Sequence, residues 1–493
     1  MAAYEDAVML GNFQGVWQQN GDSSLAKGYA YQAYNMATER GRLARAAGYE
    51  KTMPPLPDRI GTLARFYRRH IEAEENREVF VAVTLDGIYT YIAGDEAWIK
   101  RYPENGTLFR SDFDYVTYEA AVDGETVDIL VMTNNQDGMI CIYGSDLHAE
   151  RKKIQVVPDG PEIRFGVLGR HAERIWGAGV QGEPDNLYYS HPYDPFNWSA
   201  NEAQPELGGG MIQQPTWDGD EFIALKAMGG YMIAIRKNSM FIIRGTDPGT
   251  YVIDEAYGDD CPRAENSIAI DGTRMYYMAE GGIGVFDGQS AQLLAKDALY
   301  DTMRMRANDF ERTECACTAG HVYYLALRVR EHVNDKPAAN NCVIEYDTRR
   351  GTFMLRRGIR VDSFLAVNGN VYFTSGVTPG RVYRYGAGDT YDGREIETLW
   401  ETGYLDENGK AINKSAFVVR FFATGEQGAA LTVSIETEKK KKMKAVALSP
   451  KGKQHRIRIQ NKGKKFRLAL ASSGVQPWEI TGGIQIDYEI DEE

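Results

Sequence analysis

A run of lysines near residue 440 is the densest group of charged side chains in the sequence. Lys439, Lys440, Lys441, Lys442 and Lys444 fall between two segments that alternate like strands. Such a run can bind an acidic protein surface or nucleic acid, or it can be a solvated hairpin tip. Aromatic side chains that could stack on bases are not interleaved with it, so a protein partner is favoured over DNA. We therefore expect these five lysines to be assembly contacts.

Side chains that could catalyse a reaction are present but form no recognisable set. The seven histidines are scattered, with no His-Glu-x-x-His run, and no Gly-x-Ser-x-Gly elbow occurs. His171 lies in a loop-like stretch, where we expect it to be exposed. His321 lies in a strand pattern and is expected to be packed or at an edge. A single histidine without a located partner is not a catalytic triad.

A glycosidase would need two carboxylates ~5–10 Å apart. Many acidic residues are available, but solvated loop carboxylates explain them better than a catalytic pair. They are Asp218, Asp220, Glu221, Asp254, Glu255, Asp259 and Asp260. The sequence therefore predicts no catalytic residue and a protein that is not an enzyme.

Cofactor and metal motifs are equally weak. The glycine-rich stretches at 208–210 and 281–284 do not lead into a helix, so they offer no helix N-terminus to a phosphate and are expected to be sharp turns. The five cysteines are odd in number and irregularly spaced, which favours reduced thiols. Cys315 and Cys317 should face one side of a strand, but no Cys/His cluster completes a zinc site. We expect neither a cofactor nor a metal.

Charge is unevenly distributed along the chain. The net charge is −13, yet residues 396–493 contain 16 Lys/Arg against 13 Asp/Glu. An acidic body with one basic tip is the simplest interpretation, and it argues against nucleic-acid binding through the overall field of the protein.

The elements that must position these side chains are strands. From residue 78 onward, short alternating segments are separated by tight turns at 86–87, 123–124, 137–138, 229–230, 271–272, 319–320 and 368–369. Units of three or four strands recur roughly every 35–50 residues, which is the spacing of β-propeller blades. The pattern predicts an all-β fold with about six or seven irregular blades.

Four regions follow from the pattern. Residues 1–76 are expected to be an N-terminal arm with a ring-closing strand over 41–49 and a short helix over 60–74, where Ile60, Leu63, Phe66, Tyr67 and Ile71 could form one apolar face. Residues 77–386 should form the propeller, interrupted by a helix over 297–308. Residues 387–397 read as a linker, and about seven strands over 398–493 predict a β-sandwich.

No N-terminal signal and no apolar run of membrane-spanning length is visible. We expect a protein made in a cytoplasm, without a signal peptide or membrane anchor.

Scattered patches covering most of the chain resemble bacteriophage β-propeller proteins of the tail and neck, including the tail accessory or "stabilisation" proteins of short-tailed phages. The patches are residues 13–16, 35–36, 41–43, 48–49, 173–177, 187–190, 194–198, 401–406, 414, 465–468 and 478–480. Trp478 and Phe466 are expected to fill the sandwich core.

This resemblance implies a non-enzymatic virion protein that forms a ring, expected to be a hexamer, as a nozzle or adaptor of the tail or head–tail connector. It would contact other tail and neck proteins, stabilise the portal–tail assembly and line the genome exit path, with DNA passing without sequence-specific binding. The alternative is a receptor-binding or glycan-processing propeller of the phage tail. Two facing carboxylates, or aromatic rings placed to stack on a sugar, would favour that alternative.

Overall fold

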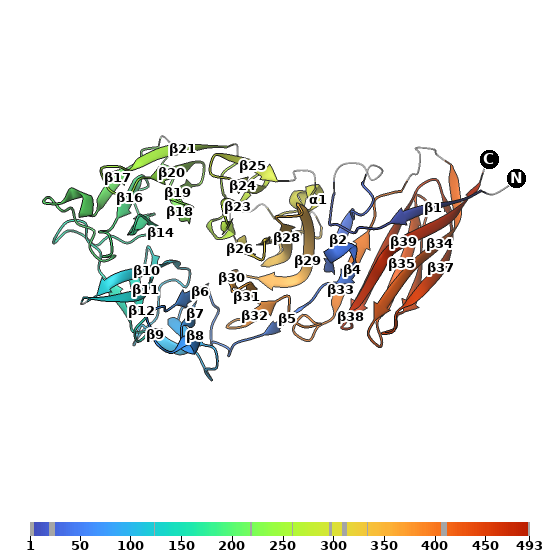
Figure 1. The fold of residues 1–493 in the computed structure, drawn as a ribbon, viewed down its shortest axis with the longest axis horizontal. Coiled ribbons are helices and arrows are strands. Elements are labelled where there is room, and N and C mark those ends of the chain that lie inside the picture. The colour runs from blue at the N-terminus through green and yellow to red at the C-terminus, as the bar shows by residue number, and fades with distance from the viewer. Residues whose placement is uncertain are drawn as a thin grey trace.

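Short alternating strands joined by tight turns fold most of the chain into seven blades around a central axis, beside a two-sheet sandwich (Figure 1). This computed structural model describes residues 4–18, 25–122, 124–216, 219–258, 260–294, 298–307, 313–332, 334–405 and 412–491. Within those residues the architecture is all-β, as predicted, and the blade count is seven.

The first four blades are antiparallel four-stranded sheets, and successive strands of each blade are neighbours. Their strands are β6 Thr62–Tyr67, β7 Glu78–Val83, β8 Ile88–Ile92 and β9 Ile99–Tyr102; β10 Asp114–Val122, β11 Glu125–Asn134, β12 Gly138–Tyr143 and β13 Ala149–Lys152; β14 Val167–His171, β15 Arg174–Ala178, β16 Asn186–Tyr189 and β17 Gly210–Gln213; and β18 Phe222–Met228, β19 Tyr231–Arg236, β20 Met240–Arg244 and β21 Val252–Gly258.

The last three blades follow the same plan. Their strands are β22 Ala269–Asp271, β23 Arg274–Ala279, β24 Gly282–Phe286 and β25 Ser290–Leu294; β26 Cys315–Ala319, β27 Val322–Leu327, β28 Asn340–Asp347 and β29 Thr352–Val361; and β30 Ser363–Val367, β31 Asn370–Thr374, β32 Val382–Tyr385 and, from the N-terminal region, β5 Tyr49–Lys51. The outer strands β21 and β25 also pair in parallel, which joins the fourth and fifth blades into one sheet.

Tight turns between strands use glycine where the backbone requires a positive φ. The turn after β22 has Gly272 at φ 62°, and the turn after β30 has Gly369 at φ 79°. Residues with a side chain are strained in this left-handed conformation, whereas glycine is not. The turns that the sequence predicted at 271–272 and 368–369 are therefore confirmed.

Ring closure depends on β5, which pairs antiparallel with β32 of the seventh blade. Tyr49 is buried there, stacked on Tyr391 at a centroid distance of 5.0 Å and edge-on to Phe373 and Tyr383. The prediction of one ring-closing strand over 41–49 was right in principle but misplaced. Only its last residue belongs to β5, and residues Leu43–Arg45 form β4 in the sandwich.

The helix predicted over 60–74 is wrong. Residues Thr62–Tyr67 form β6, the innermost strand of the first blade, and pair with β7. Leu63, Arg65 and Tyr67 alternate with Ala64 and Phe66, so the segment also fits a period of two, and pairing with β7 decides between the two periods. The propeller therefore begins inside the predicted 1–76 arm.

Helical structure is sparse elsewhere in the described residues. The helix expected over 297–308 reduces to α1 Tyr300–Arg304, and residues 297 and 308 lie outside the described residues. Four short 3₁₀ turns are η1 Glu39–Gly41, η2 Glu74–Asn76, η3 Pro205–Leu207 and η4 Glu265–Ser267. No described helix has the length and apolar composition needed to cross a membrane.

The sandwich consists of two sheets that combine both ends of the chain. One sheet contains β3 Met36–Ala37, β4 Leu43–Arg45, β39 Trp478–Asp491, β34 Asn413–Gly425 and β37 Lys453–Gly463, with β1 Tyr4–Leu10 also paired to β39; the other contains β2 Gln32–Tyr34, β33 Ile396–Glu401, β38 Phe466–Gly474, β35 Ala430–Thr437 and β36 Lys441–Ala447. The sandwich is therefore not confined to residues 398–493, because N-terminal strands contribute to both sheets.

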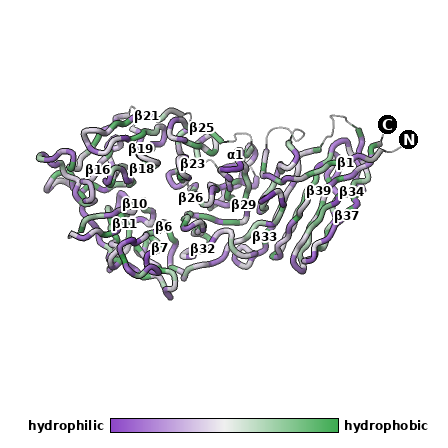
Figure 2. Tube along the Cα trace, viewed as in Figure 1, coloured by the Kyte–Doolittle hydropathy of each residue, from purple (hydrophilic) through white to green (hydrophobic). Residues whose placement is uncertain are grey.

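Propeller and sandwich share one hydrophobic core. Strand β2 pairs in parallel with β29 of the sixth blade and antiparallel with β33, so one sheet runs from the blade into the sandwich. Phe13 packs edge-on to Trp400 at 5.1 Å across this junction. Hydrophilic and hydrophobic residues mix along the sandwich strands (Figure 2) because alternate side chains face the core.

The segment predicted as a linker, 387–397, is held in this junction. The buried Arg45 guanidinium donates to the Asp389 carbonyl at 2.8 Å and to the Val475 carbonyl at 3.0 Å. These bonds tie the last turn of the propeller to the sandwich.

Candidate functional site

The predicted lysines lie at one edge of the sandwich. Lys439 and Lys440 occupy the turn after β35, and the other three are in β36, the edge strand of its sheet. All five side chains are exposed. The prediction of a hairpin tip is therefore only partly right, because most of the run is in the strand itself.

A second cationic strand lies next to β36. Strand β37 is the edge strand of the opposite sheet and contacts β36. Its exposed positions alternate with buried ones and include Lys453, Arg456 and Arg458. Residues 439–478 contain 13 Lys/Arg and no Asp/Glu. We call the surface formed by β36, β37 and their connecting turns the basic edge.

Most cations of the basic edge have no acidic partner among the residues that the structure describes. Lys441 lies 3.9 Å from Glu436. No carboxylate of the described residues is within ion-pair distance of Lys439, Lys440, Lys442, Lys444, Lys451, Lys453, Arg456 or Arg458. Cations crowded together without counter-charges repel one another, and a negatively charged partner would relieve that repulsion.

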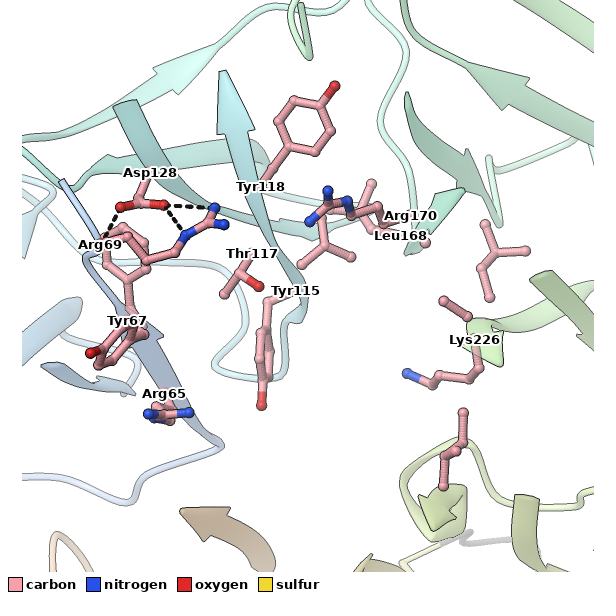
Figure 3. Close-up of a pocket in the computed structure, with 16 residues that line it drawn as sticks. Arg65, Tyr67, Arg69, Tyr115, Thr117, Tyr118, Asp128, Leu168, Arg170 and Lys226 are labelled. Carbon is pink, nitrogen blue, oxygen red and sulfur yellow. Dashed lines mark hydrogen bonds and ion pairs between the residues drawn. The ribbon is translucent and has the colours of Figure 1, made fainter. Parts of the chain in front are cut away.

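A second candidate site lies among the inner strands of the propeller, where a cavity of about 580 Å³ opens (Figure 3). Residues from β6, β10, β14, β18 and β22, the first strands of five blades, line it. The lining residues are Arg65, Phe66, Tyr67, Arg69, Tyr115, Val116, Thr117, Tyr118, Asp128, Leu168, Gly169, Arg170, Leu225, Lys226, Ala227 and Ile270. We call this cavity the central pocket.

Three of the cations that line the central pocket pair with carboxylates that do not line it. Arg65 donates to Glu78 at 3.0 Å, and Arg170 donates to Glu173 at 3.3 Å. The Lys226 ammonium lies 3.6 Å from Asp114.

Tyrosines orient two of these groups further. The Arg65 guanidinium lies over the Tyr67 ring at 5.1 Å from the centroid, and Arg170 lies over Tyr118 at 5.5 Å. Burial and the neighbouring Asp114 raise the pKa of Tyr115 to about 12, so its hydroxyl is protonated at neutral pH and can donate a hydrogen bond.

Asp128 is the one carboxylate among the described lining residues, and it is already bonded. It is buried, it accepts the backbone N–H groups of Arg69 and His70, and it pairs with the Arg69 guanidinium at 2.9 Å (Figure 3). A retaining or inverting glycosidase would need a second facing carboxylate. The lining residues therefore do not supply a carboxylate pair.

Possible metal ligands meet beside this pocket. One ligand atom each from His70, Glu119 and Asp128 lie within 4.8 Å of one another. Arg69 pairs with Glu119 at 2.6 Å and with Asp128 at 2.9 Å, so its guanidinium already neutralises both carboxylates. A metal ion would have to displace this guanidinium.

The structure also places the two histidines that the sequence singled out. His171 is buried, contrary to the expectation of exposure, and donates from Nε2 to the Gly245 carbonyl at 2.8 Å. His321 is in the turn before β27 rather than packed, 3.4 Å from Asp271.

Those acidic residues proposed as solvated loop carboxylates that the structure describes do not converge on either site. Asp220 is buried and accepts backbone N–H groups of Lys237 and Asn238, whereas Glu221 and Glu255 are exposed. Asp218 and Asp259 lie outside the described residues. The described cysteines are free thiols, and Cys315 and Cys317 are both buried.

Sequence reasoning missed the central pocket. Its charged members lie on different blades, up to about 160 residues apart, so no local motif connects them. One sequence feature does indicate the pocket, namely a cation inside the innermost strand of a blade, as with Arg65 in β6 and Lys226 in β18.

Comparisons with known proteins concern the fold. No protein-family model matches the chain, and no curated protein matches it. Among solved structures, the computationally designed Ika8 protein is 11% identical, with a TM-score of 0.39, over 69% of this chain and 99% of that chain. The WD40 domain of Neurospora crassa Pan2 is 12% identical, with a TM-score of 0.40, over 73% of this chain and 99% of that chain.

Proposed function

We propose that this protein is a non-enzymatic structural component of a bacteriophage particle, part of a ring in the tail or neck, which docks through the basic edge of its sandwich. The observation that carries the proposal is the absence of carboxylate partners, among the described residues, for eight exposed cations on β36, β37 and their turns. Without a partner such a surface only adds repulsion.

Charge separation supports docking onto an acidic neighbour. Residues outside 396–493 contain 56 Asp/Glu and 40 Lys/Arg, so the rest of the chain has a charge of −16. In a ring, the basic edge of one copy could face an acidic surface of the next copy or of a neighbouring tail protein. A hexamer remains our expectation for the ring. An acidic wall along the genome path would repel phosphate, so DNA could pass without sticking.

The residues that carry the resemblance to phage propellers have framework roles here. Trp176 and Trp198 are fully buried in the blades, and Phe466 and Trp478 are buried in the sandwich. Asp406, at the end of one patch, lies outside the described residues. The resemblance therefore involves architecture rather than a catalytic centre, which is in keeping with a structural role.

An edge strand that is rich in lysine has a second established use. Lysines on an exposed edge prevent that edge from pairing with other chains. Under this interpretation the basic edge would be a protective device, and the protein would show no charge-dependent contact in a particle.

Imaging of phage particles with and without the protein tests the proposal. We expect purified particles to contain the chain as a ring at the neck or tail, and particles that lack it to lose that density and leak or fail to retain DNA. Absence of the chain from purified particles would contradict the proposal. Its location at a fibre tip would favour the receptor-binding alternative.

A further inference from the structure

The central pocket has the chemistry of a ligand site, and no role in docking uses it. Its volume of about 580 Å³ is within the range of small-molecule sites, roughly 300–1,000 Å³. Side chains from separate blades point into this common space, including Arg65, Tyr115, Arg170 and Lys226 (Figure 3).

Most of the charged side chains that line the central pocket are cationic. Four lining residues are cationic, and the one lining carboxylate, Asp128, is taken by Arg69. Each of the other three cations has a carboxylate partner outside the lining, at 3.0 to 3.6 Å. A guanidinium has five N–H donors, so an Arg65 or Arg170 bonded once from behind keeps donors for a ligand. The pocket can therefore bind an oxyanion with side chains that are already oriented.

Hydroxyl groups provide a second kind of contact. Within the described part of the chain, the side-chain hydroxyls of Tyr67, Tyr115 and Thr117 have no hydrogen-bond partner. These hydroxyls can both donate and accept, as the hydroxyl groups of a sugar require.

An apolar wall completes the pocket. Leu168, Leu225, Ala227 and Ile270 line it together with the rings of Tyr67 and Tyr115. Such a wall suits the C–H face of a sugar ring, whereas inorganic phosphate would leave it unused.

We propose that the central pocket binds an acidic sugar, with its carboxylate attracted by the charges of Arg65, Arg170 and Lys226 and its hydroxyls bonded to Tyr67, Tyr115 and Thr117. The proposed role is binding alone, with no bond made or broken. This inference does not depend on the docking role of the basic edge, and its confirmation would favour the receptor-binding alternative.

Titration calorimetry of the full chain with glucuronate tests the assignment, with glucose and inorganic phosphate as comparison probes. We expect saturable glucuronate binding with a Kd of about 1 mM or lower. Glucose, which lacks the carboxylate, should bind roughly tenfold more weakly, and phosphate should compete poorly. Equal binding of glucose, or phosphate binding as tight as that of glucuronate, would overturn the proposal, as would the absence of saturable binding.

Variants identify the site. Arg170→Gln should weaken glucuronate binding by roughly tenfold. Arg244→Gln is the matched control, since Arg244 also has a carboxylate partner, Asp254, and lies over a tyrosine ring, Tyr231, but is outside the pocket. Equal losses in both variants would contradict the site. If Arg170→Gln does not fold, Lys226→Gln takes its place, because its long contact to Asp114 contributes little to stability.

Discussion

The central pocket and the basic edge are both rich in Lys and Arg, but they differ in where the counter-charges are. In the pocket, Arg65, Arg170 and Lys226 each have a carboxylate within 3.6 Å. On the basic edge, eight exposed cations have no such partner among the described residues. Pairing weakens the outward field of a cation, whereas the field of an unpaired cation extends about one Debye length, ~8 Å, into solution.

This difference separates two kinds of recognition. A pocket of paired, oriented cations suits a small ligand that is recognised by contact geometry. An exposed row of unpaired cations suits a large acidic surface that is attracted from a distance, with a strong dependence on salt. The pocket charges should accordingly contribute to folding, and those of the edge should not.

The largest loss of unfolding free energy should come from opening the ring of blades that forms the pocket. Tyr49→Ala removes the buried ring of β5 that packs on Phe373, Tyr383 and Tyr391. We expect the free energy of unfolding to fall by about 3–5 kcal/mol, as for other buried aromatic truncations. Denaturant unfolding measures it. Tyr49→Phe is the control, because it keeps the ring and loses only the bond to Arg394; a loss as large as that of the alanine variant would contradict closure by ring packing.

Removing the buried carboxylate of the pocket should cause the second-largest loss of unfolding free energy. Asp128→Ala leaves the Arg69 and His70 backbone N–H groups without their acceptor and removes a partner of the Arg69 guanidinium. We expect a loss of about 2–4 kcal/mol in unfolding free energy, and a smaller one for Asp128→Asn, which keeps one acceptor oxygen. A change below about 0.5 kcal/mol would show that the pocket charges do not support the fold.

A smaller, pH-dependent effect on stability is expected at the end of a strand that lines the pocket. His171 ends β14, and burial lowers its pKa below the usual value, against the bond to the Gly245 carbonyl. The unfolded chain then binds more protons below pH about 6.5, so stability is complete above that pH and falls as the pH drops towards the folded pKa. His171→Gln should remove this pH dependence of the unfolding free energy between about pH 7.5 and 5.5. If the unfolding free energies of the wild-type protein and the variant depend on pH in the same way, the role assigned to His171 is wrong.

Local sequence patterns predicted most strands but not the assembly of the pocket. The turns predicted at 86–87, 229–230 and 368–369 directly precede β8, β19 and β31, because each of these strands depends on a hairpin partner a few residues away. The segment that became β6 was misassigned, since its apolar residues fit both the helical and the strand period.

Pairing between strands that are far apart in the sequence explains the remaining differences between the predictions and the structure. Nothing local to Leu43–Arg45 indicates that this strand joins β39, more than 400 residues later. The five lysines were visible as a run, yet the sequence alone could not show that β37 lies beside them and extends the same charge. Arg65, Arg170 and Lys226 line one cavity only once the blades close into a ring.

Replacement of Lys439, Lys440, Lys441, Lys442 and Lys444 by glutamine tests the central claim most directly, with thermal unfolding and incorporation into phage particles measured on the same variant. Lys153→Gln with Lys336→Gln controls for loss of exposed charge elsewhere. We predict unfolding free energy unchanged within about 0.5 kcal/mol, together with particles that lose the protein or become sensitive to salt, while the control assembles normally. Normal assembly of the five-lysine variant, with unchanged salt sensitivity, would contradict the account and leave the run as a solvated strand edge.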